Sequence, residues 1–152
     1  MNRRRQIEMT PEEHERFLQD SRTLILCTLD REGHPHAVAM WFCLIDGRVH
    51  MTSFRKAQKV LNLRRDPRAT LLAESGDVYS ELRGLMIRCR GEVIEDPDLC
   101  VDVLMKVQAR HGGSEDPAVR EALRSQAARR SVLCFEPVRM SSWDHGKLGG
   151  TY

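Results

Sequence analysis

The chain has 152 residues, a length typical of one compact domain or of one subunit in a symmetric assembly. Hydrophobic residues make up 41% and charged residues 30% of it, which excludes disordered and fibrous proteins. A formal charge of +2 is too balanced for a protein whose main partner is a nucleic acid. No apolar run approaches the ~20 residues that cross a bilayer, so we expect one cytoplasmic domain over residues 1–152, with a flexible segment at 1–9 and no membrane contact.

Cysteine and histidine spacing gives no sign of a metal site. The chain contains five cysteines: Cys27, Cys43, Cys89, Cys100 and Cys134. No two of them have the two-residue spacing of zinc and thioredoxin motifs, so we expect reduced, mostly buried thiols. The histidines of His34-Pro35-His36 lack a third ligand, and we predict no metal there.

The first expected element is a helix over residues 11–20. Thr10 caps it, Pro11 suits its first position, and Glu13 completes a capping box. Runs of apolar and β-branched residues then predict three antiparallel strands, at 23–29, 35–45 and 48–52. Asp46-Gly47 favours a two-residue hairpin turn between the last two, so the three strands are expected to form a meander.

After the third strand, the spacing of apolar residues changes from that of a strand to that of a helix. Val60, Leu61 and Leu63 stand among basic residues at helical spacing, which predicts a short helix that opens near Ser53 and stops before Asp66-Pro67. The remaining elements are expected to be strands at 68–74 and 83–95, helices at 97–110 and 117–129, and a last strand at 132–140.

Six antiparallel strands with helices inserted at their ends indicate a mainly β fold. This order favours a small closed or half-closed β-barrel over a doubly wound sheet. No GxGxxG sequence follows a strand, so the chain lacks a nicotinamide-binding fingerprint.

A candidate phosphate site lies where the third strand leads into the short helix. Thr52 and Ser53 supply hydroxyl groups, Lys56 and Lys59 supply ammonium groups, and the helix start supplies free amides. Such groups within one turn can hold a phosphate. The alternative is that a hydroxyl only caps the helix and the lysines are solvated.

Three segments together resemble the pyridoxamine 5′-phosphate oxidase-like split-barrel superfamily of flavin and deazaflavin oxidoreductases. They are residues 52–68, the hairpin at 30–42, and the ending at 142–152, which is similar to a deazaflavin-using branch. The resemblance extends over residues 10–152. It implies a split β-barrel of the FMN-binding type, with about six antiparallel strands and peripheral helices.

The resemblance also implies a homodimer that holds a flavin-like ring at the subunit interface. Its cofactor-binding positions correspond here to His36, Val38, Met40, Thr52, Ser53, Lys56, Gln58, Lys59 and Trp143. Thr52, Ser53 and Lys59 would hold the phosphate, with Gln58 beside them and Lys56 as a looser match. His36, Val38 and Met40 share one strand face and would approach the ring; barrel lining explains them equally well. Trp143 would close over the cofactor of either subunit or pin the chain end to the barrel.

The expected cofactor is the deazaflavin F-420, with FMN as the alternative. Arginine accounts for 20 of the 24 basic residues, and this composition and the ending resemble actinobacterial proteins, in whose cells the deazaflavin is available. Arginines around the short helix would steer its anionic tail or form a solvated face: Arg55, Arg64, Arg65 and Arg68.

The expected function is hydride transfer between F-420 and a small conjugated organic substrate. The arginine-rich substrate motif of pyridoxamine phosphate oxidases has no counterpart after Met140, which argues against vitamin B6 oxidation. The alternatives are an FMN-dependent reductase or oxidase and a flavin or haem carrier without turnover. The cofactor carries the chemistry, so no catalytic residue is assigned. His36, His50 or His145 would serve as a proton donor or have a packing role.

Overall fold

A computed structural model of the chain describes residues 2–149, and its centre is one antiparallel sheet. The helices and strands, with two short 3-10 helices η1 and η2, are α1 (Arg3–Gln6), α2 (Pro11–Asp20), β1 (Thr23–Leu29), β2 (Pro35–Trp41), β3 (Cys43–Ile45), β4 (Arg48–Phe54), α3 (Gln58–Arg65), β5 (Arg68–Ser75), η1 (Tyr79–Glu81), β6 (Arg83–Ile94), α4 (Pro97–Arg110), α5 (Pro117–Ala127), β7 (Arg130–Asp144) and η2 (His145–Leu148).

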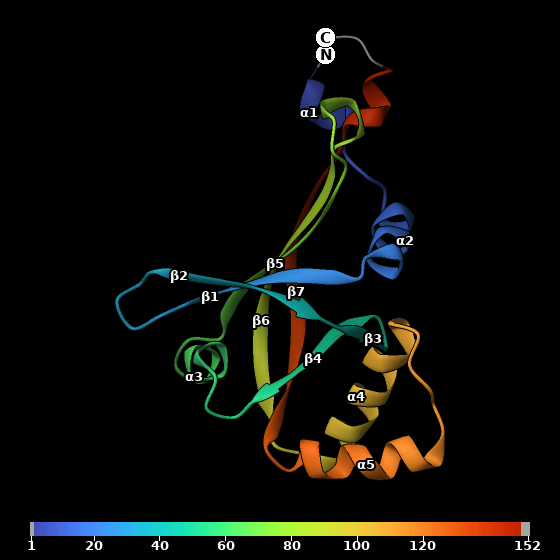
Figure 1. Ribbon diagram of the computed structural model, residues 1–152. Helices are drawn as coiled ribbons and strands as arrows, with labels where there is room; N and C mark the ends of the chain where they lie inside the picture. The colour runs from blue at the N-terminus through green and yellow to red at the C-terminus, as the bar shows by residue number, and fades with distance from the viewer. Residues whose placement is uncertain (1, 150–152) are drawn as a thin grey trace.

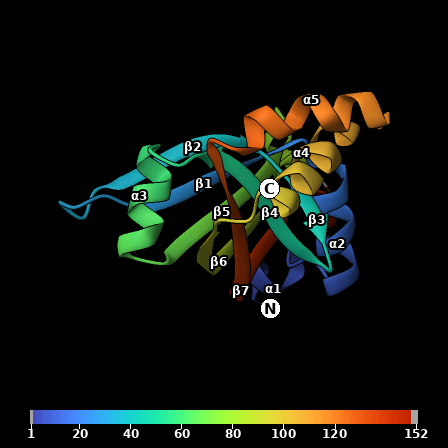
Figure 2. The same ribbon diagram turned by 90° about the horizontal axis from the view of Figure 1, so that it is seen from below.

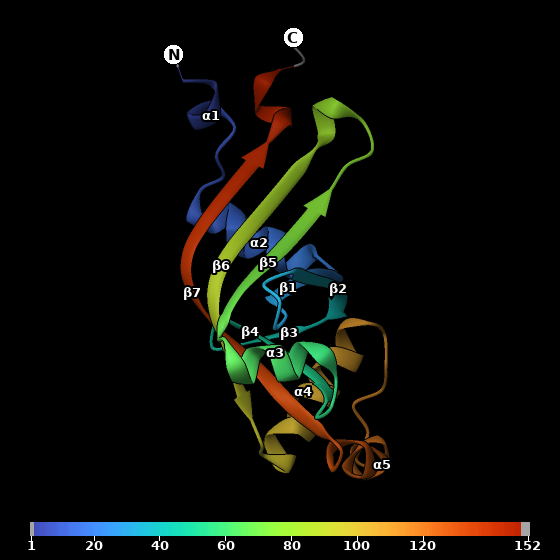
Figure 3. The same ribbon diagram turned by 90° about the vertical axis from the view of Figure 1, so that its left-hand side faces the viewer.

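The sheet has seven strands in the order β2-β1-β5-β6-β7-β4-β3 and curls into a half-barrel (Figure 1). The strands β5, β6 and β7 run side by side as a long curved ribbon (Figure 3). The mainly β split-barrel fold predicted from the sequence is therefore confirmed.

The expected single strand over residues 35–45 is wrong. It divides at Phe42, whose side chain is fully buried, into β2, which pairs with β1, and β3, which pairs with β4. The two halves stand at opposite ends of the sheet order, so the predicted meander is interrupted. The physical reason is burial: the Phe42 ring enters the core, with the Arg110 guanidinium 4.5 Å from its centroid, and the chain bends there.

Two local sequence signals are confirmed: the capping box at the start of α2 and the turn between β3 and β4. Thr10 accepts a hydrogen bond from the Glu13 amide at 3.3 Å, and the Glu13 carboxylate accepts one from the Thr10 amide at 2.7 Å. Asp46 and Gly47 have φ values of 50° and 75°, the conformation of a type I′ hairpin turn. These contacts span at most three residues, so the sequence predicts them directly.

Two apolar cores lie on opposite sides of the sheet. The larger core fills the half-barrel and receives Phe17 from α2 and Val60 and Leu63 from α3. The smaller core lies between β3, β7 and the pair α4 and α5, which gather on one side of the sheet, away from α3 (Figure 2). The helix α5 ends at Ala127, two residues before the expected end at 129.

The first residues contact the last described strand. The Asp144 amide donates to the Ile7 carbonyl oxygen at 2.7 Å, and the Met9 amide donates to Ser142 Oγ at 3.0 Å. The helix α1 also falls within residues 1–9, whose expected flexibility stays a prediction.

The five cysteines are all free thiols, four of them buried. Burial raises the pKa of the Cys43 thiol to about 11 and that of Cys89 to about 12, so both remain protonated and unreactive at neutral pH. Among residues 2–149, no three His, Cys, Asp or Glu side chains are grouped so as to hold a metal ion. No helix in the same residues is long and apolar enough to cross a membrane.

Candidate functional site

The helix α3 lies between the β1–β2 hairpin and β4 (Figure 1) and begins at Gln58 rather than near Ser53. Ser53 pairs with Ser131 of β7, and this pairing keeps the chain extended as far as Phe54. The residue that caps α3 is Ala57, which has no side-chain acceptor. The first amides of α3 therefore receive no cap from a side chain and are available to an anion.

Thr52 and Ser53 lie on opposite faces of β4, because side chains alternate along a strand. Thr52 is half-buried, and its Oγ1 accepts a hydrogen bond from Arg130 Nη1 at 3.4 Å. Ser53 is 4% exposed and faces the other side. The structure thus joins Thr52 with Arg130 but does not bring the two hydroxyl groups together.

Two positive charges, those of Lys59 and Arg130, stand together without a carboxylate. Burial lowers the pKa of Lys59, and the neighbouring positive charge of Arg130 lowers it further. None of the ion pairs within residues 2–149 includes either side chain. Arg130 Nε is buried and has no hydrogen-bond partner in that part of the chain. Partly buried cations with unused donors are suited to an anion that supplies the missing charge and acceptors.

We name Thr52, Lys59, Arg130 and the first amides of α3 the phosphate cradle. Its donor set fits the phosphate of a flavin-type cofactor. Lys56 is exposed in the turn before α3. Sequence reasoning missed Arg130 because it lies 78 residues from Thr52, and only the pairing of β4 with β7 brings it there.

The ring-facing residues proposed from the sequence share one face of β2. His36, Val38 and Met40 are half-buried, while the residues between them are exposed. Val38 and Met40 pack against the larger core. His36 lines an open cleft of about 630 Å³ together with Gln58 of α3, so the fold brings these two predicted residues to one place.

Of the three candidate proton donors, His36 has a buried ring nitrogen, Nδ1, without a hydrogen-bond partner in the described chain. The buried ring of His50 is hydrogen-bonded through Nδ1 to the Arg48 carbonyl oxygen at 3.1 Å. His145 Nδ1 lies 3.0 Å from the Tyr79 carbonyl oxygen, at the far end of the sheet. Only His36 of the three lines the cleft beside α3.

Asn62 fixes α3 to the sheet. It is fully buried, and its Nδ2 donates to Thr28 Oγ1 of β1 at 3.0 Å, while its Oδ1 accepts from Gln58 Nε2 at 2.7 Å. Its amide therefore positions the helix that carries Lys59. Sequence reasoning overlooked it, although an asparagine at a position flanked by Val60 and Leu63 was a usable signal of a buried polar contact.

Trp143 lies far from the phosphate cradle within one chain. It is eleven residues beyond Val132, the partner of Thr52, along β7, roughly 35 Å at about 3.3 Å per residue. Its indole lies over Gly84, where an added Cβ would come within 2.0 Å of the ring. The packing role expected for Trp143 therefore has a contact in the structure. Of the ending 142–152, residues 150–152 lie outside the described chain.

The arginines expected to steer an anionic tail are engaged in other contacts. Arg55 and Arg64 pair with Glu95, Arg65 donates to the Leu29 carbonyl oxygen, and Arg68 pairs with Asp66.

Comparison with known proteins identifies the family. Residues 10–144 match the family model described as pyridoxamine 5′-phosphate oxidase, and the chain belongs to this family. A conserved hypothetical protein from Mycobacterium tuberculosis is 35% identical, with a TM-score of 0.91 over 97% of this chain and 92% of that chain. No curated protein matches this chain.

Two further solved structures with this fold bear names that state a function. An F-420 reductase is 26% identical, with a TM-score of 0.68 over 87% of this chain and 98% of that chain. A haem storage protein from Vibrio cholerae is 18% identical, with a TM-score of 0.68 over 87% of this chain and 94% of that chain. The second likeness shows the fold alone.

We expect the substitution Asn62→Leu to destabilise the protein by about 1–3 kcal/mol, because it leaves the buried Thr28 hydroxyl without its partner. The double variant Asn62→Leu/Thr28→Val removes both polar groups and should recover part of that loss. Urea unfolding of the two single variants and the double variant measures this coupling. Losses that simply add in the double variant, with no recovery, would contradict the anchoring role.

Proposed function

We propose that this protein is an oxidoreductase that transfers a hydride between F-420 and a small conjugated organic substrate. The family includes oxidoreductases, and its members bind flavin-type cofactors. The observation that carries the proposal is the phosphate cradle, whose Lys59 and Arg130 lack a carboxylate partner within residues 2–149. The similarity to an F-420 reductase favours the deazaflavin over FMN.

The residues of this chain would bind and orient the cofactor. Thr52, Lys59, Arg130 and the amides of α3 would hold the phosphate, and the half-buried β2 face would lie against the ring. When bound, the deazaflavin supplies the hydride chemistry. Val38 and Met40 are apolar and packed on the core, so they would exclude water from the reacting ring.

His36 is the residue proposed to supply a proton to the substrate. Its buried Nδ1 has no partner in the described residues, so no structural hydrogen bond fixes which ring nitrogen carries the proton. It borders an open cleft of about 630 Å³, which is large enough for a small organic molecule. An imidazole ring has one donor and one acceptor nitrogen, which suits it to proton transfer.

The runner-up is an FMN-dependent reductase or oxidase, because a cradle for one phosphate also accepts FMN. A carrier without turnover is the third candidate, because a haem storage protein has the same fold.

Reduced F-420 should be oxidised by this protein in the presence of a conjugated acceptor, with or without dioxygen. Anaerobic and aerobic assays with reduced F-420 and reduced FMN, over a panel of quinones, unsaturated ketones and linear tetrapyrroles, measure this. Turnover with FMN and dioxygen alone would support the oxidase instead. Tight cofactor binding without turnover on any acceptor would support the carrier.

Lys59→Gln and Arg130→Gln should each weaken binding of a phosphate-bearing cofactor by roughly 10- to 100-fold. The reason is that each variant loses one charge-assisted contact, which contributes about 1.5–3 kcal/mol. Lys59→Gln should not lower the melting temperature, because Lys59 has no ion pair among residues 2–149. Arg130→Gln also removes the hydrogen bond to Thr52 and the cation–π contact with Phe54, so a small decrease in its melting temperature is expected. Lys106→Gln, which removes an exposed charge on α4, is the matched control. Fluorescence titration with F-420 and FMN provides the affinities; unchanged values in both variants would refute the cradle.

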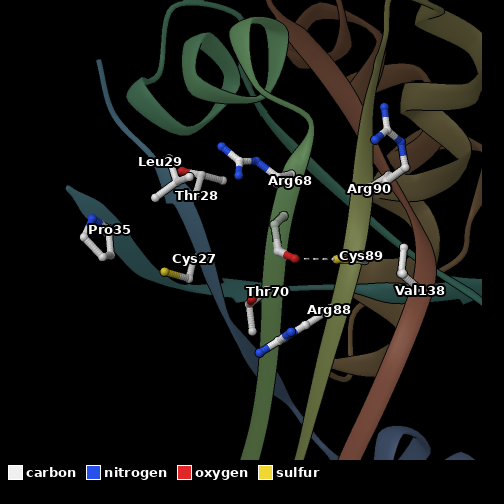
Figure 4. Close-up of a pocket in the computed structure, with 11 residues that line it drawn as sticks. Cys27, Thr28, Leu29, Pro35, Arg68, Thr70, Arg88, Cys89, Arg90 and Val138 are labelled. Carbon is white, nitrogen blue, oxygen red and sulfur yellow. Dashed lines mark hydrogen bonds between the residues drawn. The ribbon is translucent and has the colours of Figure 1, made fainter. Parts of the chain in front are cut away.

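A second copy of the chain is proposed to cover the outer face of the sheet. Val138 is 67% exposed there. Beside Val138 an open groove of about 470 Å³ has Arg68, Arg88 and Arg90 around it (Figure 4). Arg68 is paired with Asp66, whereas Arg88 and Arg90 take part in no ion pair within residues 2–149.

A two-fold partner can supply the acidic groups that Arg88 and Arg90 lack. Glu74 is exposed on the same face of β5 as Arg68, six residues further along the strand. A C2 interface brings one patch against its own copy, so the acidic end of one subunit can meet the basic end of the other.

Light scattering at micromolar concentration should therefore return a dimer. Val138→Glu should produce a monomer, because it places charge at the centre of the proposed interface. Val78→Glu, at a position 54% exposed before η1, is the control and should remain dimeric. A monomeric unmodified protein would remove the proposal.

A further inference from the structure

The open cleft beside His36 has one wall that comes from the helix α3. This wall consists of Gln58, Leu61 and Arg65. The Leu61 side chain is 46% exposed, so the wall is partly apolar. The hydrogen-bonding groups of Gln58 and Arg65 therefore decide which small molecules the wall favours.

Arg65 determines how the buried side-chain amide of Asn62 is oriented. A guanidinium group donates hydrogen bonds and accepts none. Arg65 Nη2 donates to the Leu29 carbonyl oxygen and lies 3.5 Å from Asn62 Oδ1. The other end of the amide, Nδ2, donates to Thr28 Oγ1 at 3.0 Å. The reversed amide would turn an N–H group toward a cation, so Asn62 presents its oxygen on this side.

The orientation of Asn62 in turn fixes that of Gln58, one helical turn earlier. Gln58 Nε2 donates to Asn62 Oδ1 at 2.7 Å. Because Asn62 offers an oxygen at this contact, Gln58 has to offer its nitrogen. Gln58 Oε1 then accepts no hydrogen bond from residues 2–149. The side chain is exposed and lines the cleft, so this acceptor is available to a bound molecule.

His36 lines the same cleft, and its buried Nδ1 has no partner among the described residues. The proposed function gives His36 the role of supplying a proton to the substrate. The cleft thus combines one group suited to proton transfer with one fixed acceptor, Gln58 Oε1. A conjugated molecule with both a reducible carbonyl and an N–H or O–H group matches the two.

We infer that Gln58 is a specificity-determining residue whose Oε1 selects substrates that donate a hydrogen bond, and that Arg65 positions it through Asn62. The substrate class is a conjugated carbonyl compound with an N–H or O–H group, such as a vinylogous amide. This inference rests on the proposed function, in which the substrate occupies the cleft beside His36. A substrate without such a donor would leave Gln58 Oε1 unpaired.

The test uses two quinones that differ in one N–H group, methylamino-naphthoquinone and dimethylamino-naphthoquinone. Each quinone takes a hydride from the reduced cofactor and a proton, and becomes the hydroquinone. The value of kcat/KM is measured for both with reduced F-420 and with reduced FMN, after subtraction of the uncatalysed rate. Dissociation constants of the two quinones, measured by equilibrium dialysis without cofactor, provide a readout that does not depend on turnover.

Three variants separate the acceptor from the residue that orients it. Gln58→Met keeps the length of the side chain but removes the acceptor. Arg65→Met removes the cation beside Asn62, whereas Arg65→Lys retains a positively charged donor. Gln126→Met, the same substitution at an exposed position of α5, is the matched control. Each result is a ratio of two quinones for one protein, so a partly unfolded variant still gives a valid ratio.

We expect the unmodified protein, Arg65→Lys and Gln126→Met to favour the quinone with the N–H group. The preference should be roughly two- to tenfold in kcat/KM and in Kd, the effect of one neutral hydrogen bond. Gln58→Met should lose this preference. Arg65→Met should lose it as well, because both amides can then reverse and turn the nitrogen of Gln58 toward the cleft.

Two results would overturn the inference and leave the proposed function standing. One is turnover of both quinones by the unmodified protein without a preference. The other is a preference that persists in Gln58→Met or in Arg65→Met. If neither reduced cofactor supports turnover of either quinone or of any other conjugated acceptor, the proposed function fails, and the inference fails with it.

Discussion

The pairing of β4 with β7 is the constraint on which the candidate site depends. It keeps residues 52–54 extended, places Arg130 opposite Phe54, and brings its guanidinium to Thr52. Without this register Lys59 would face solvent alone, as a charged side chain at the start of a short helix usually does. The same pairing brings Arg130 to Thr52, so one backbone contact places two of the groups proposed to hold the phosphate.

The arrangement of these basic groups is unfavourable for the stability of the chain on its own. Burial and the charge of Arg130 lower the pKa of Lys59, so the folded protein opposes the charged form of this lysine. Arg130 Nε lacks a partner among the described residues, although burial disfavours unpaired donors. By contrast, Arg55 and Arg64 beside the helix α3 both pair with Glu95. The contrast between these two regions is the basis of the proposal that an external anion completes the cradle.

The helix α3 is fixed to the sheet by apolar and polar contacts. Val60 and Leu63 bury its apolar side, and Asn62 adds a directional contact to Thr28. The open cleft beside His36 lies along the other side of the same helix, where Gln58 and Leu61 border it. One short helix therefore positions both the lysine proposed to bind the phosphate and one wall of the cleft beside His36.

The sequence by itself determined the elements whose causes are local: the capping box of Thr10 and Glu13, the turn at Asp46-Gly47, and the alternation that puts His36, Val38 and Met40 on one face. The family resemblance also led to the split barrel and to Lys59 beside a phosphate site. The tertiary structure decided the bend at Phe42, the later start of α3, the separation of Thr52 from Ser53, and the presence of Arg130. The reason is the distance along the sequence over which each interaction acts. Capping hydrogen bonds, turns and the alternation of side chains depend on a few neighbouring residues. The burial of the Phe42 ring and the contact of Thr52 with Arg130, 78 residues away, depend on how the whole sheet is assembled.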